Sequence, residues 1–339
     1  MRHPDHQTPP STLTDVARLA GVSPSTVSRI LNGTARVSDD KRRAVLAAIE
    51  TINFAPNQMA QALKKGRSMT IGIVVQDFAS PFFDETLRGV DDGLKGTGYT
   101  SIIASGHWNE EEETARIGQL VARKVDGVIL LSGRSTSAAI ARLAAQRPIV
   151  ATGCAVSAPN THGFTLDNEF GAHLAVRHLL ELGHRRIAFI AGRSGHQDAV
   201  SRLAGYRRAL NEEDIVFDPK LVVDGDFRET GGMAAVNGLL ETGQQFSAIF
   251  AANDLSAFGA RLALYRKGIR VPDDISLVGF DDLPGAAYAT PPLTTVRQPL
   301  YEMGRIAAGA VLCLIHGDPV AAALPPLALM LRESTRRLR

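Results

Sequence analysis

The fold of the N-terminal part of the chain is decided by residues 12–31, which read TLTDVARLAGVSPSTVSRIL. Two short helices are predicted within this stretch. Thr12 is expected to cap the first, with an acidic residue three positions on that completes a capping box. Gly21 permits a tight turn, after which Ser23 caps the second helix and Pro24 takes its first position. Two helices joined by a short glycine-containing turn are typical of a helix-turn-helix, whose second helix lies in the major groove of DNA.

A third helix is predicted from the VSDDKR motif at residues 37–42. Ser38 is expected to cap it, and the two aspartates that follow suit the positive end of the helix dipole. Apolar residues at helical spacing predict a small core shared by the three helices. Its expected members are Val16, Ala17, Leu19, Ala20, Val27, Ile30, Leu31, Val45, Leu46, Ala48, Ile49 and Ile52.

The outward face of the second helix is predicted to read base pairs. Arg29 can make two hydrogen bonds with guanine, worth about 1–3 kcal/mol of discrimination between bases. Ser25 can bond a base edge or a phosphate, and Pro24 can contact a thymine methyl group. A three-helix bundle that binds a protein is the alternative, and the position of Arg29 favours DNA. The DNA-binding candidates in this region are Thr14, Ser23, Pro24, Ser25, Thr26, Ser28, Arg29 and Asn32.

A second DNA-binding segment is predicted at residues 57–65, which read NQMAQALKK between a proline and a glycine. A helix of about nine residues is marginal alone in water. One interpretation is a linker helix packed on the rest of the chain. The other is a segment that folds on DNA, with Leu63 wedged between base pairs of the minor groove. The candidates here are Asn57, Ala60, Leu63 and Lys64.

The composition of the 339-residue chain, 45% hydrophobic and 21% charged, predicts a globular protein of two or three domains. Residues 1–67 carry ten Lys and Arg against five Asp and Glu, and the remainder carries 27 against 30. A basic head on a mildly acidic remainder suits nucleic-acid binding. The two cysteines are far apart and belong to no Cys/His motif, so neither a disulfide nor a metal site is predicted. The sequence lacks a signal peptide and an apolar run of about 18 residues, so a cytoplasmic protein without a membrane partner is expected.

From Met69 onward, short apolar runs alternate with helical patterns, which predicts parallel sheets covered by helices. The number of strands favours two similar lobes with a ligand between them. Strands are expected at 70–75, 101–104, 127–131, 148–151, 186–190, 248–251 and 276–280. Helices are expected at 83–95, 110–124, 138–146, 170–182, 201–211 and 255–266.

Polar and aromatic side chains gather where these strands end, which predicts a ligand site. Arg202 offers a fork of five donors for vicinal hydroxyls or a carboxylate, and Asp281 can accept hydroxyl protons. Helix caps, loop residues and core packing are the alternatives for single members of the set. The effector-binding candidates are Phe82, Phe83, His196, Asp198, Arg202, Phe227, Asn253, Asp281 and Gln298. The role of Trp108 stays open between the ligand, the lobe surface and a subunit interface.

The sequence gives little support for an enzymatic function. No GxGxxG follows a strand, and GxxxxGK[ST], HExxH and GxSxG are absent from the sequence. We therefore expect a binding protein without catalytic residues or a cofactor.

Three motifs together resemble the lactose-repressor family of bacterial transcription regulators: the run from Thr12 to Gly33, the VSDDKR motif, and NFAPNQMAQALKKGRS followed by IGIVV. The resemblance covers nearly the whole chain from Thr12. It implies an all-α helix-turn-helix head with a hinge helix, followed by an α/β two-lobed body like that of periplasmic binding proteins, with parallel sheets. It implies that Pro24, Ser25 and Arg29 read bases, that Leu63 intercalates with Ala60 beside it, and that Arg202, Phe227, Asn253, Asp281 and Gln298 contact the ligand.

The expected organisation is a disordered tail at 1–11, a DNA-binding domain at 12–56, a hinge helix and linker at 57–67, and an effector-binding and dimerisation domain at 68–339. Its lobes are expected at about 70–165 plus 296–325, and at about 166–295 plus 326–339. The expected function is a homodimeric repressor that binds a near-palindromic operator and responds to a sugar or sugar derivative. A purine-like corepressor is the alternative effector, and a sugar-binding transport protein is the rival from another class.

Overall fold

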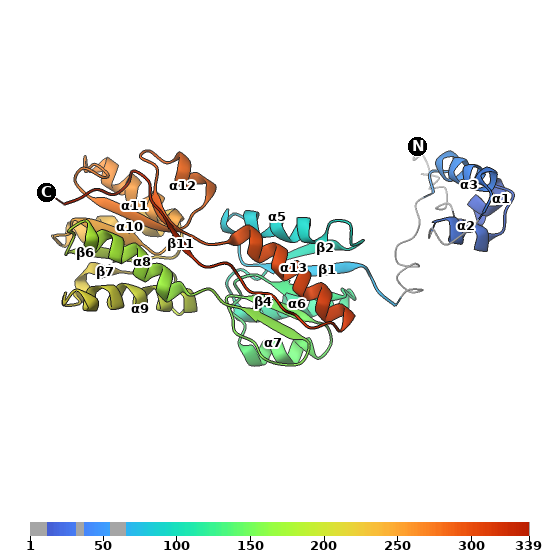
Figure 1. Cartoon of the computed structure of the whole chain (residues 1–339), viewed down its shortest axis with the longest axis horizontal. Helices are drawn as coiled ribbons and strands as arrows, with labels where there is room; N and C mark the ends of the chain where they lie inside the picture. Colours follow the sequence, from blue (N-terminus) through green and yellow to red (C-terminus); the bar gives the residue numbers. More distant parts are fainter. Residues whose placement is uncertain (1–11, 32–36, 55–65, 339) are drawn as a thin grey trace, which may run out of the picture. The chain divides into compact units, whose positions relative to one another are not determined.

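The computed structural model describes residues 12–31, 37–54 and 66–338, and the chain divides into two compact units, Met1–Ser68 and Met69–Arg339. We call these units the head and the body (Figure 1). The sites predicted at Asn32, Asn57, Ala60, Leu63 and Lys64 lie outside the described residues.

The head contains the predicted helices, α1 (Leu13–Leu19), α2 (Pro24–Leu31) and α3 (Asp39–Thr51). The capping box is present, because the Thr12 hydroxyl accepts from the Asp15 amide and the Asp15 carboxylate accepts from the Thr12 amide. Gly21 has a φ of +63°, and the Ser23 hydroxyl accepts from the Thr26 amide at 3.3 Å. The two caps and the left-handed glycine therefore form the turn that the sequence predicts.

Three expectations for the head are wrong. Ser38 precedes α3, but its side chain makes no capping hydrogen bond. Leu19 and Leu46 are about half exposed, at 52% and 51%, instead of lying in the core. Leu19 lies about one turn from Val16 in α1 and Leu46 follows Val45 in α3, so each lies near the buried apolar stripe but at its solvent-exposed edge. Phe54, which follows α3, fills the core instead.

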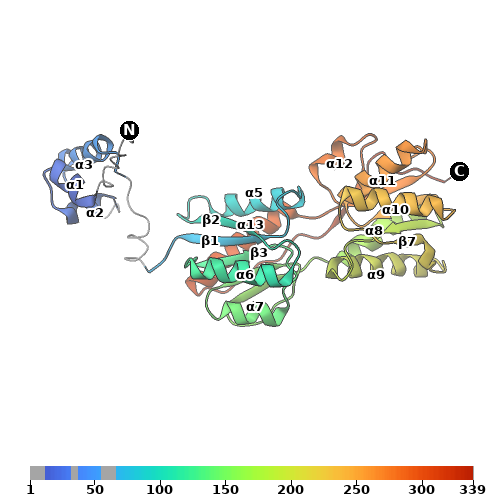
Figure 2. The same ribbon diagram turned by 180° about the vertical axis from the view of Figure 1, so that it is seen from behind.

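The body contains two sheets covered by helices, which confirms the predicted fold class. Lobe 1 has a parallel sheet in the order β2-β1-β3-β4-β5. Its strands are β1 (Thr70–Val75), β2 (Thr100–Ser105), β3 (Gly127–Leu130), β4 (Ile149–Thr152) and β5 (Thr161–Phe164). Helices α5 (Phe82–Leu94) and α13 (Leu300–His316) cover one face, and α6 (Glu110–Ala122) and α7 (Ser137–Ala144) cover the other (Figures 1 and 2).

Lobe 2 has a sheet in the order β11-β10-β9-β8-β6-β7, in which only β11 is antiparallel to its neighbour. Its strands are β6 (Ile187–Ile190), β7 (Val222–Val223), β8 (Ala248–Ala251), β9 (Ser276–Asp281), β10 (Thr294–Arg297) and β11 (Ala328–Met330). Helices α8 (Asn168–Glu181) and α9 (Gln197–Glu212) pack on one face, and α10 (Glu229–Glu241) and α11 (Asp254–Arg266) pack on the other. The short helix α12 (Pro284–Tyr288) follows β9, and a 3-10 turn at Pro219–Leu221 precedes β7.

The chain passes between the two sheets three times: from β5 to α8, from β10 to α13, and from α13 to β11. Strand β10 runs to Arg297, so the second connection begins at Gln298, slightly later than expected. Several elements lie outside the predicted set. Strands β5, β7, β10 and β11 are only two to four residues long, and α10 contains three glycines. Helix α13, by contrast, has apolar residues at helical spacing and could have been predicted from the sequence.

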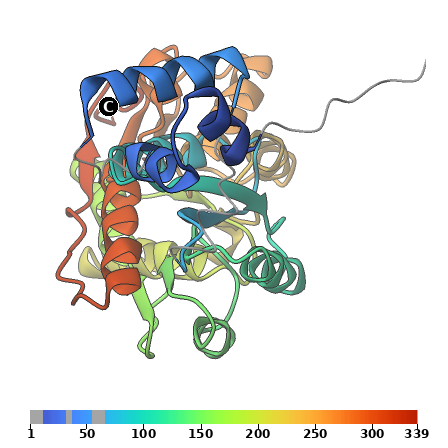
Figure 3. The ribbon, with the colours of Figure 1, turned by 90° about the vertical axis from the view of Figure 1, so that its right-hand side faces the viewer.

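Helix α13 returns from the second lobe to pack closely on α5 (α13 is red in Figure 3). Two glycines permit the close approach. A Cβ atom at Gly89 would lie 2.0 Å from the Tyr301 carbonyl oxygen, and one at Gly304 would lie 1.9 Å from the Thr86 carbonyl oxygen. The helix that completes lobe 1 is therefore held by backbone contacts that no larger residue would allow.

Replacing Gly89 with alanine is expected to lower the free energy of unfolding by about 1–3 kcal/mol, because the new methyl group overlaps the Tyr301 carbonyl. Urea unfolding of the full-length protein measures this change. Gly118 is the matched control, since it lies within α6 and nothing would touch its added Cβ. Gly118→Ala should be neutral or slightly stabilising. Equal stability of Gly89→Ala and the wild type would contradict the backbone contact between α5 and α13.

Candidate functional site

A cavity of about 340 Å³ lies where the carboxyl ends of strands from both lobes meet. Its volume is within the range of about 300–1,000 Å³ that is usual for small-molecule sites. The structure brings eight of the nine effector-binding candidates to its wall: Phe82, Phe83, His196, Asp198, Arg202, Phe227, Asn253 and Asp281. The ninth, Gln298, lies behind Asp281 and donates to its carboxylate at 2.7 Å.

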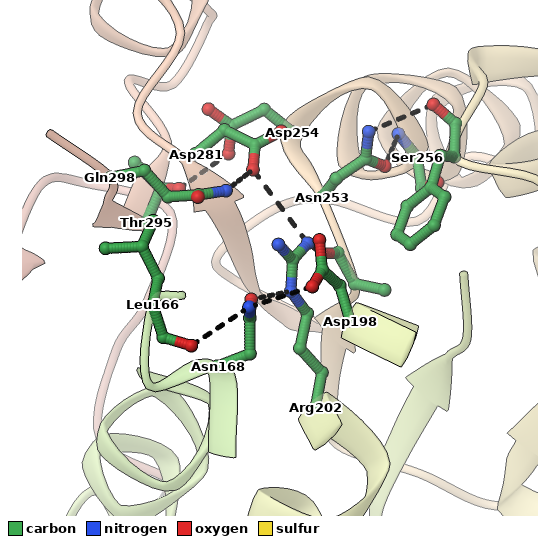
Figure 4. Close-up of polar contacts among 12 residues, drawn as sticks. Leu166, Asn168, Asp198, Arg202, Asn253, Asp254, Ser256, Asp281, Thr295 and Gln298 are labelled. Carbon is green, nitrogen blue, oxygen red and sulfur yellow. Dashed lines mark hydrogen bonds and ion pairs between the residues drawn. The ribbon is translucent and has the colours of Figure 1, made fainter. Parts of the chain in front are cut away.

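Arg202 is the most constrained polar group of the cavity (Figure 4). Its side chain is 4% exposed, and its Nε donates to the Asn168 side-chain oxygen at 2.8 Å. One terminal nitrogen donates to the Ala252 carbonyl and lies 3.9 Å from the Asp281 carboxylate. The guanidinium also lies 3.8 Å from the centre of the Phe280 ring. Helix α9 supplies the arginine, and α8 and the end of β8 hold its orientation, so it reaches the cavity already aligned.

Two buried carboxylates face this arginine region from lobe 2. Burial raises the pKa of Asp281 to about 7, although Arg202 and the hydrogen bond from Gln298 favour the ionised form. Burial also raises the pKa of Asp254 well above its usual value, and the nearby Asp281 carboxylate adds to this. Asp254 accepts from the Thr295 hydroxyl at 2.6 Å and from the Leu283 amide at 2.8 Å. Asp254 therefore has fixed protein partners, whereas Asp281 lines the cavity.

His196 presents a buried ring nitrogen with no hydrogen-bond partner among the described residues. Its Nδ1 accepts from the Asp198 amide at 3.2 Å, while Nε2 has no partner. Burial lowers the pKa of the ring, and the positive charge of Arg202 lowers it further. A neutral ring whose Nδ1 accepts must carry its proton on Nε2. His196 therefore carries a buried N–H group beside the cavity that has no partner among the described residues.

Aromatic rings form the apolar part of the wall. The His196 ring lies between those of Trp108, at 5.3 Å, and Phe227, at 5.6 Å, and Phe83 lies 6.3 Å beyond Trp108. Phe83 is also buried in the core of lobe 1, so the core packing that the sequence allowed as an alternative is present as well. Trp108 also lines the cavity.

Several residues that line this cavity have unfavourable backbone conformations. Four lining residues other than glycine have positive φ values: Trp108 (+57°), Ser132 (+50°), Phe227 (+66°) and Asp281 (+119°). Such conformations are unfavourable for residues with a side chain and persist only where surrounding contacts impose them. The loops that carry these residues are therefore held in fixed conformations at the cavity wall.

Further lining residues come from outside the candidate set, chiefly Asp77, Ser132, Asp226, Arg228 and Glu229. Asp77 in lobe 1 and Arg228 in lobe 2 form an ion pair at 2.7 Å across the cavity mouth. Asp77 lies two residues after the end of a predicted strand, which is the signal that would have found it. Arg228 is recognisable only once the two lobes face each other.

Asp282, next to Asp281, ties two of the connections between the lobes together. Its side chain is 6% exposed and pairs with Arg297 at 2.7 Å and with Arg332 at 2.6 Å. Arg297 ends β10, and Arg332 follows β11. Adjacent carboxylates therefore face the cavity on one side and the lobe connections on the other.

The candidate DNA-binding face of the head is largely open to solvent. Thr14, Ser23, Pro24, Ser25 and Arg29 are exposed, and Thr26 and Ser28 are half-buried. The Ser23 hydroxyl lies 2.9 Å from that of Ser25 and 2.8 Å from that of Thr26. These hydroxyls form a small network at the start of α2, the end of the helix that meets base edges in helix-turn-helix proteins.

Two classes of feature are absent from the part of the chain that the structure describes. It contains no group of three or more His, Cys, Asp or Glu side chains placed to hold a metal ion. None of its helices is long and apolar enough to span a membrane.

Comparison with known proteins decides the family. Residues 12–57 match the model of bacterial regulatory proteins of the lacI family, and residues 176–335 match the periplasmic binding protein-like domain. The chain is 38% identical over 311 residues to the HTH-type transcriptional regulator GalR of Escherichia coli (strain K12), with 91% of each chain covered. This chain belongs to the lacI family. As a lacI-family protein it is a DNA-binding transcription regulator, which confirms the resemblance seen in the sequence.

Two solved structures of this family cover nearly the whole chain. The lac repressor dimer bound to operator and the anti-inducer ONPF is 30% identical with a TM-score of 0.87, covering 96% of this chain and 99% of that one. The transcriptional regulator CelR in complex with cellobiose is 37% identical with a TM-score of 0.71, also covering 96% and 99%. The likeness spans head and body alike.

The raised pKa of Asp281 leads to a pH-dependent stability. In the folded chain its pKa of about 7 lies above the value of about 3.9 for an exposed aspartate, so the folded state keeps a proton that the unfolded state has lost. This stabilising contribution should be present near pH 4 and should be lost as the pH rises through 7. Urea unfolding between pH 4 and 8 measures it, as the difference between wild type and Asp281→Asn. The same substitution at exposed Asp224 should leave the pH profile unchanged. Parallel profiles for wild type and Asp281→Asn would refute the assignment.

Proposed function

We propose that this chain is a cytoplasmic, homodimeric repressor whose cavity between the lobes binds a sugar or sugar derivative, and that occupancy of the cavity sets the affinity for operator DNA. The observation that carries the proposal is the buried Arg202–Asp281 pair at the cavity wall. Buried charged groups are costly to retain unless they are paired, and a polar ligand at this wall would add partners to both. The relatives bound to cellobiose and to operator DNA support the same assignment.

The distribution of polar and apolar groups suits a sugar ring. Arg202 donates, Asp281 accepts when ionised, and Trp108 and Phe227 offer aromatic surfaces. A sugar presents hydroxyls around its edge and apolar C–H groups on its faces, so both kinds of wall are used. A purine is the second candidate, because the rings of Trp108 and Phe227 also suit a flat ligand.

Ion pairing across the cavity mouth supports coupling between the ligand and the lobes. The Asp77–Arg228 pair joins lobe 1 to lobe 2, and Arg193 of lobe 2 lies 5.6 Å from the centre of the Trp108 ring of lobe 1. A ligand that contacts both walls would favour one relative position of the lobes over another. The ligand can change DNA affinity by no more than the difference between its own affinities for the two arrangements of the lobes.

The DNA-binding part of the proposal assigns base reading to Pro24, Ser25 and Arg29 at the start and exposed face of α2. Thr14, Ser23, Thr26 and Ser28 would support this helix on the phosphate backbone. An enzymatic role is not part of the proposal, because the polar groups of the cavity are arranged for binding and the relatives are transcription regulators.

Asp281→Ala is expected to abolish the response to the effector while leaving DNA binding intact, because the substitution removes an acceptor from the cavity and leaves the head unchanged. Ribose, galactose, cellobiose and hypoxanthine are suitable first probes. The fluorescence of Trp108, the only tryptophan of the chain, reports binding directly, and operator binding with and without the probe reports the response. Asp224→Ala, at an exposed site, is the control. A normal response in Asp281→Ala would place the effector elsewhere, and a response to hypoxanthine alone would replace the sugar with a purine.

Arg29→Ala is expected to relax base preference at one position of each half-site, since a bidentate arginine contributes about 1–3 kcal/mol of discrimination. Selection from randomised double-stranded DNA measures the preference. Arg18→Ala removes the same charge from α1, at a residue 76% exposed, and should weaken binding to all sequences without changing the preference. Unchanged preference in Arg29→Ala would remove this residue from the base readers.

A further inference from the structure

Glu113 is a fully buried carboxylate in lobe 1 that lies outside the cavity wall. It belongs to α6, whose other acidic residues in the first turn are exposed. One of its oxygens accepts from the Gln76 side chain at 2.9 Å and from the Arg134 amide at 2.9 Å. The other accepts from the Ser135 amide at 2.7 Å. Both oxygens are therefore occupied by N–H donors, which a carboxylate satisfies and a neutral amide cannot.

Gln76 extends these contacts to the only tryptophan. Its side chain is also fully buried, and its oxygen accepts from the Trp108 amide at 3.3 Å. Its backbone carbonyl accepts from the Ser105 hydroxyl at 3.0 Å. Glu113 and Gln76 thus join the segments that follow β1, β2 and β3, which are separate in the sequence.

These three segments carry the lobe 1 wall of the cavity, including Asp77, Trp108 and Ser132. Trp108 and Ser132 have positive φ values, as does His107. Contacts must impose such conformations on residues other than glycine, and the bonds to Gln76 and Glu113 supply them on both segments. The chain also leaves room for the carboxylate, because a Cβ atom at Gly133 would lie 2.8 Å from a Glu113 oxygen.

We propose that Glu113 is a positioning residue of the effector site: through Gln76 and the amides of Arg134 and Ser135 it holds the strand-end segments of lobe 1, and with them the Trp108 ring, in the geometry that the ligand meets. Its role is separate from that of the Arg202–Asp281 pair, which lies in lobe 2. The inference rests on the proposed function for the identity of the site, but the geometry it concerns exists without ligand.

The test uses Trp108 in the full-length protein without ligand. Glu113→Gln keeps the shape of the side chain but turns one acceptor into a donor that faces an N–H group. Acrylamide should then quench Trp108 with a roughly twofold higher constant, because the segment opens locally while the fold persists. The emission maximum should shift to longer wavelength. Glu113→Asp, which keeps both acceptors, should recover part of the wild-type signal.

Glu111→Gln is the matched control, because it makes the same change at an exposed position of the same helix. Its quenching constant should equal that of the wild type. Gln76→Met serves as a second variant, since it cuts the link to Trp108 while leaving the Arg134 and Ser135 amides bonded to Glu113. It should also raise the quenching constant, and this result keeps the proposal testable if Glu113→Gln does not fold.

Wild-type emission and quenching in both Glu113→Gln and Gln76→Met would overturn the proposal, even if a ligand is found for the cavity. Conversely, failure of every sugar and purine probe to bind would count against the proposed function and leave the altered Trp108 signal standing. Where a probe does bind, Glu113→Gln should weaken it while operator binding without the probe stays at the wild-type level.

Discussion

The backbone conformation at the buried residues Asp281 and Asp282 is the constraint on which the rest of the body depends. Both residues have positive φ values, +119° and +58°, so their side chains leave the end of β9 in different directions. Asp281 faces Arg202 and the cavity, while Asp282 pairs with Arg297 and Arg332 beside two of the connections between the lobes. A ligand that moves the first carboxylate therefore acts on backbone that also holds the lobe connections.

The two lobes support their cavity-facing loops with different kinds of polar contact. Loops at the carboxyl ends of parallel strands converge on the ligand and need support that the sheet itself does not provide. Lobe 2 supplies it with charged groups, the Arg202 guanidinium against Asn168 and Asp281. Lobe 1 supplies it with the buried Glu113–Gln76 pair bonded to backbone amides. The Asp77–Arg228 ion pair then joins the two walls.

The sequence predicted the architecture and eight of the seventeen residues that line the cavity, because alternation and strand ends are local signals. It predicted Arg202 and Asp281 at one site, although the two are far apart in the chain. It did not predict Arg228 or Glu113, because their roles arise from partners in segments brought together only by the fold. Leu19 and Leu46 were misplaced for a related reason: an apolar residue near a helical stripe joins the core only if a neighbouring helix covers it. Effector contacts and base contacts stay predictions, since both need the partner.

The charge of the cavity bears on the class of effector. Arginine stays protonated in proteins, so Arg202 carries a positive charge whether or not a ligand is present. Asp281, with a pKa of about 7, balances that charge only in part near neutral pH. A neutral polyhydroxyl ligand can donate to the carboxylate and accept from the guanidinium without disturbing their pairing. An anionic ligand would compete with Asp281 for the same cation and would drive that carboxyl toward its protonated form. Effector affinity that is strongest above pH 7 would thus indicate a neutral sugar, and affinity that rises below pH 7 would indicate a sugar acid.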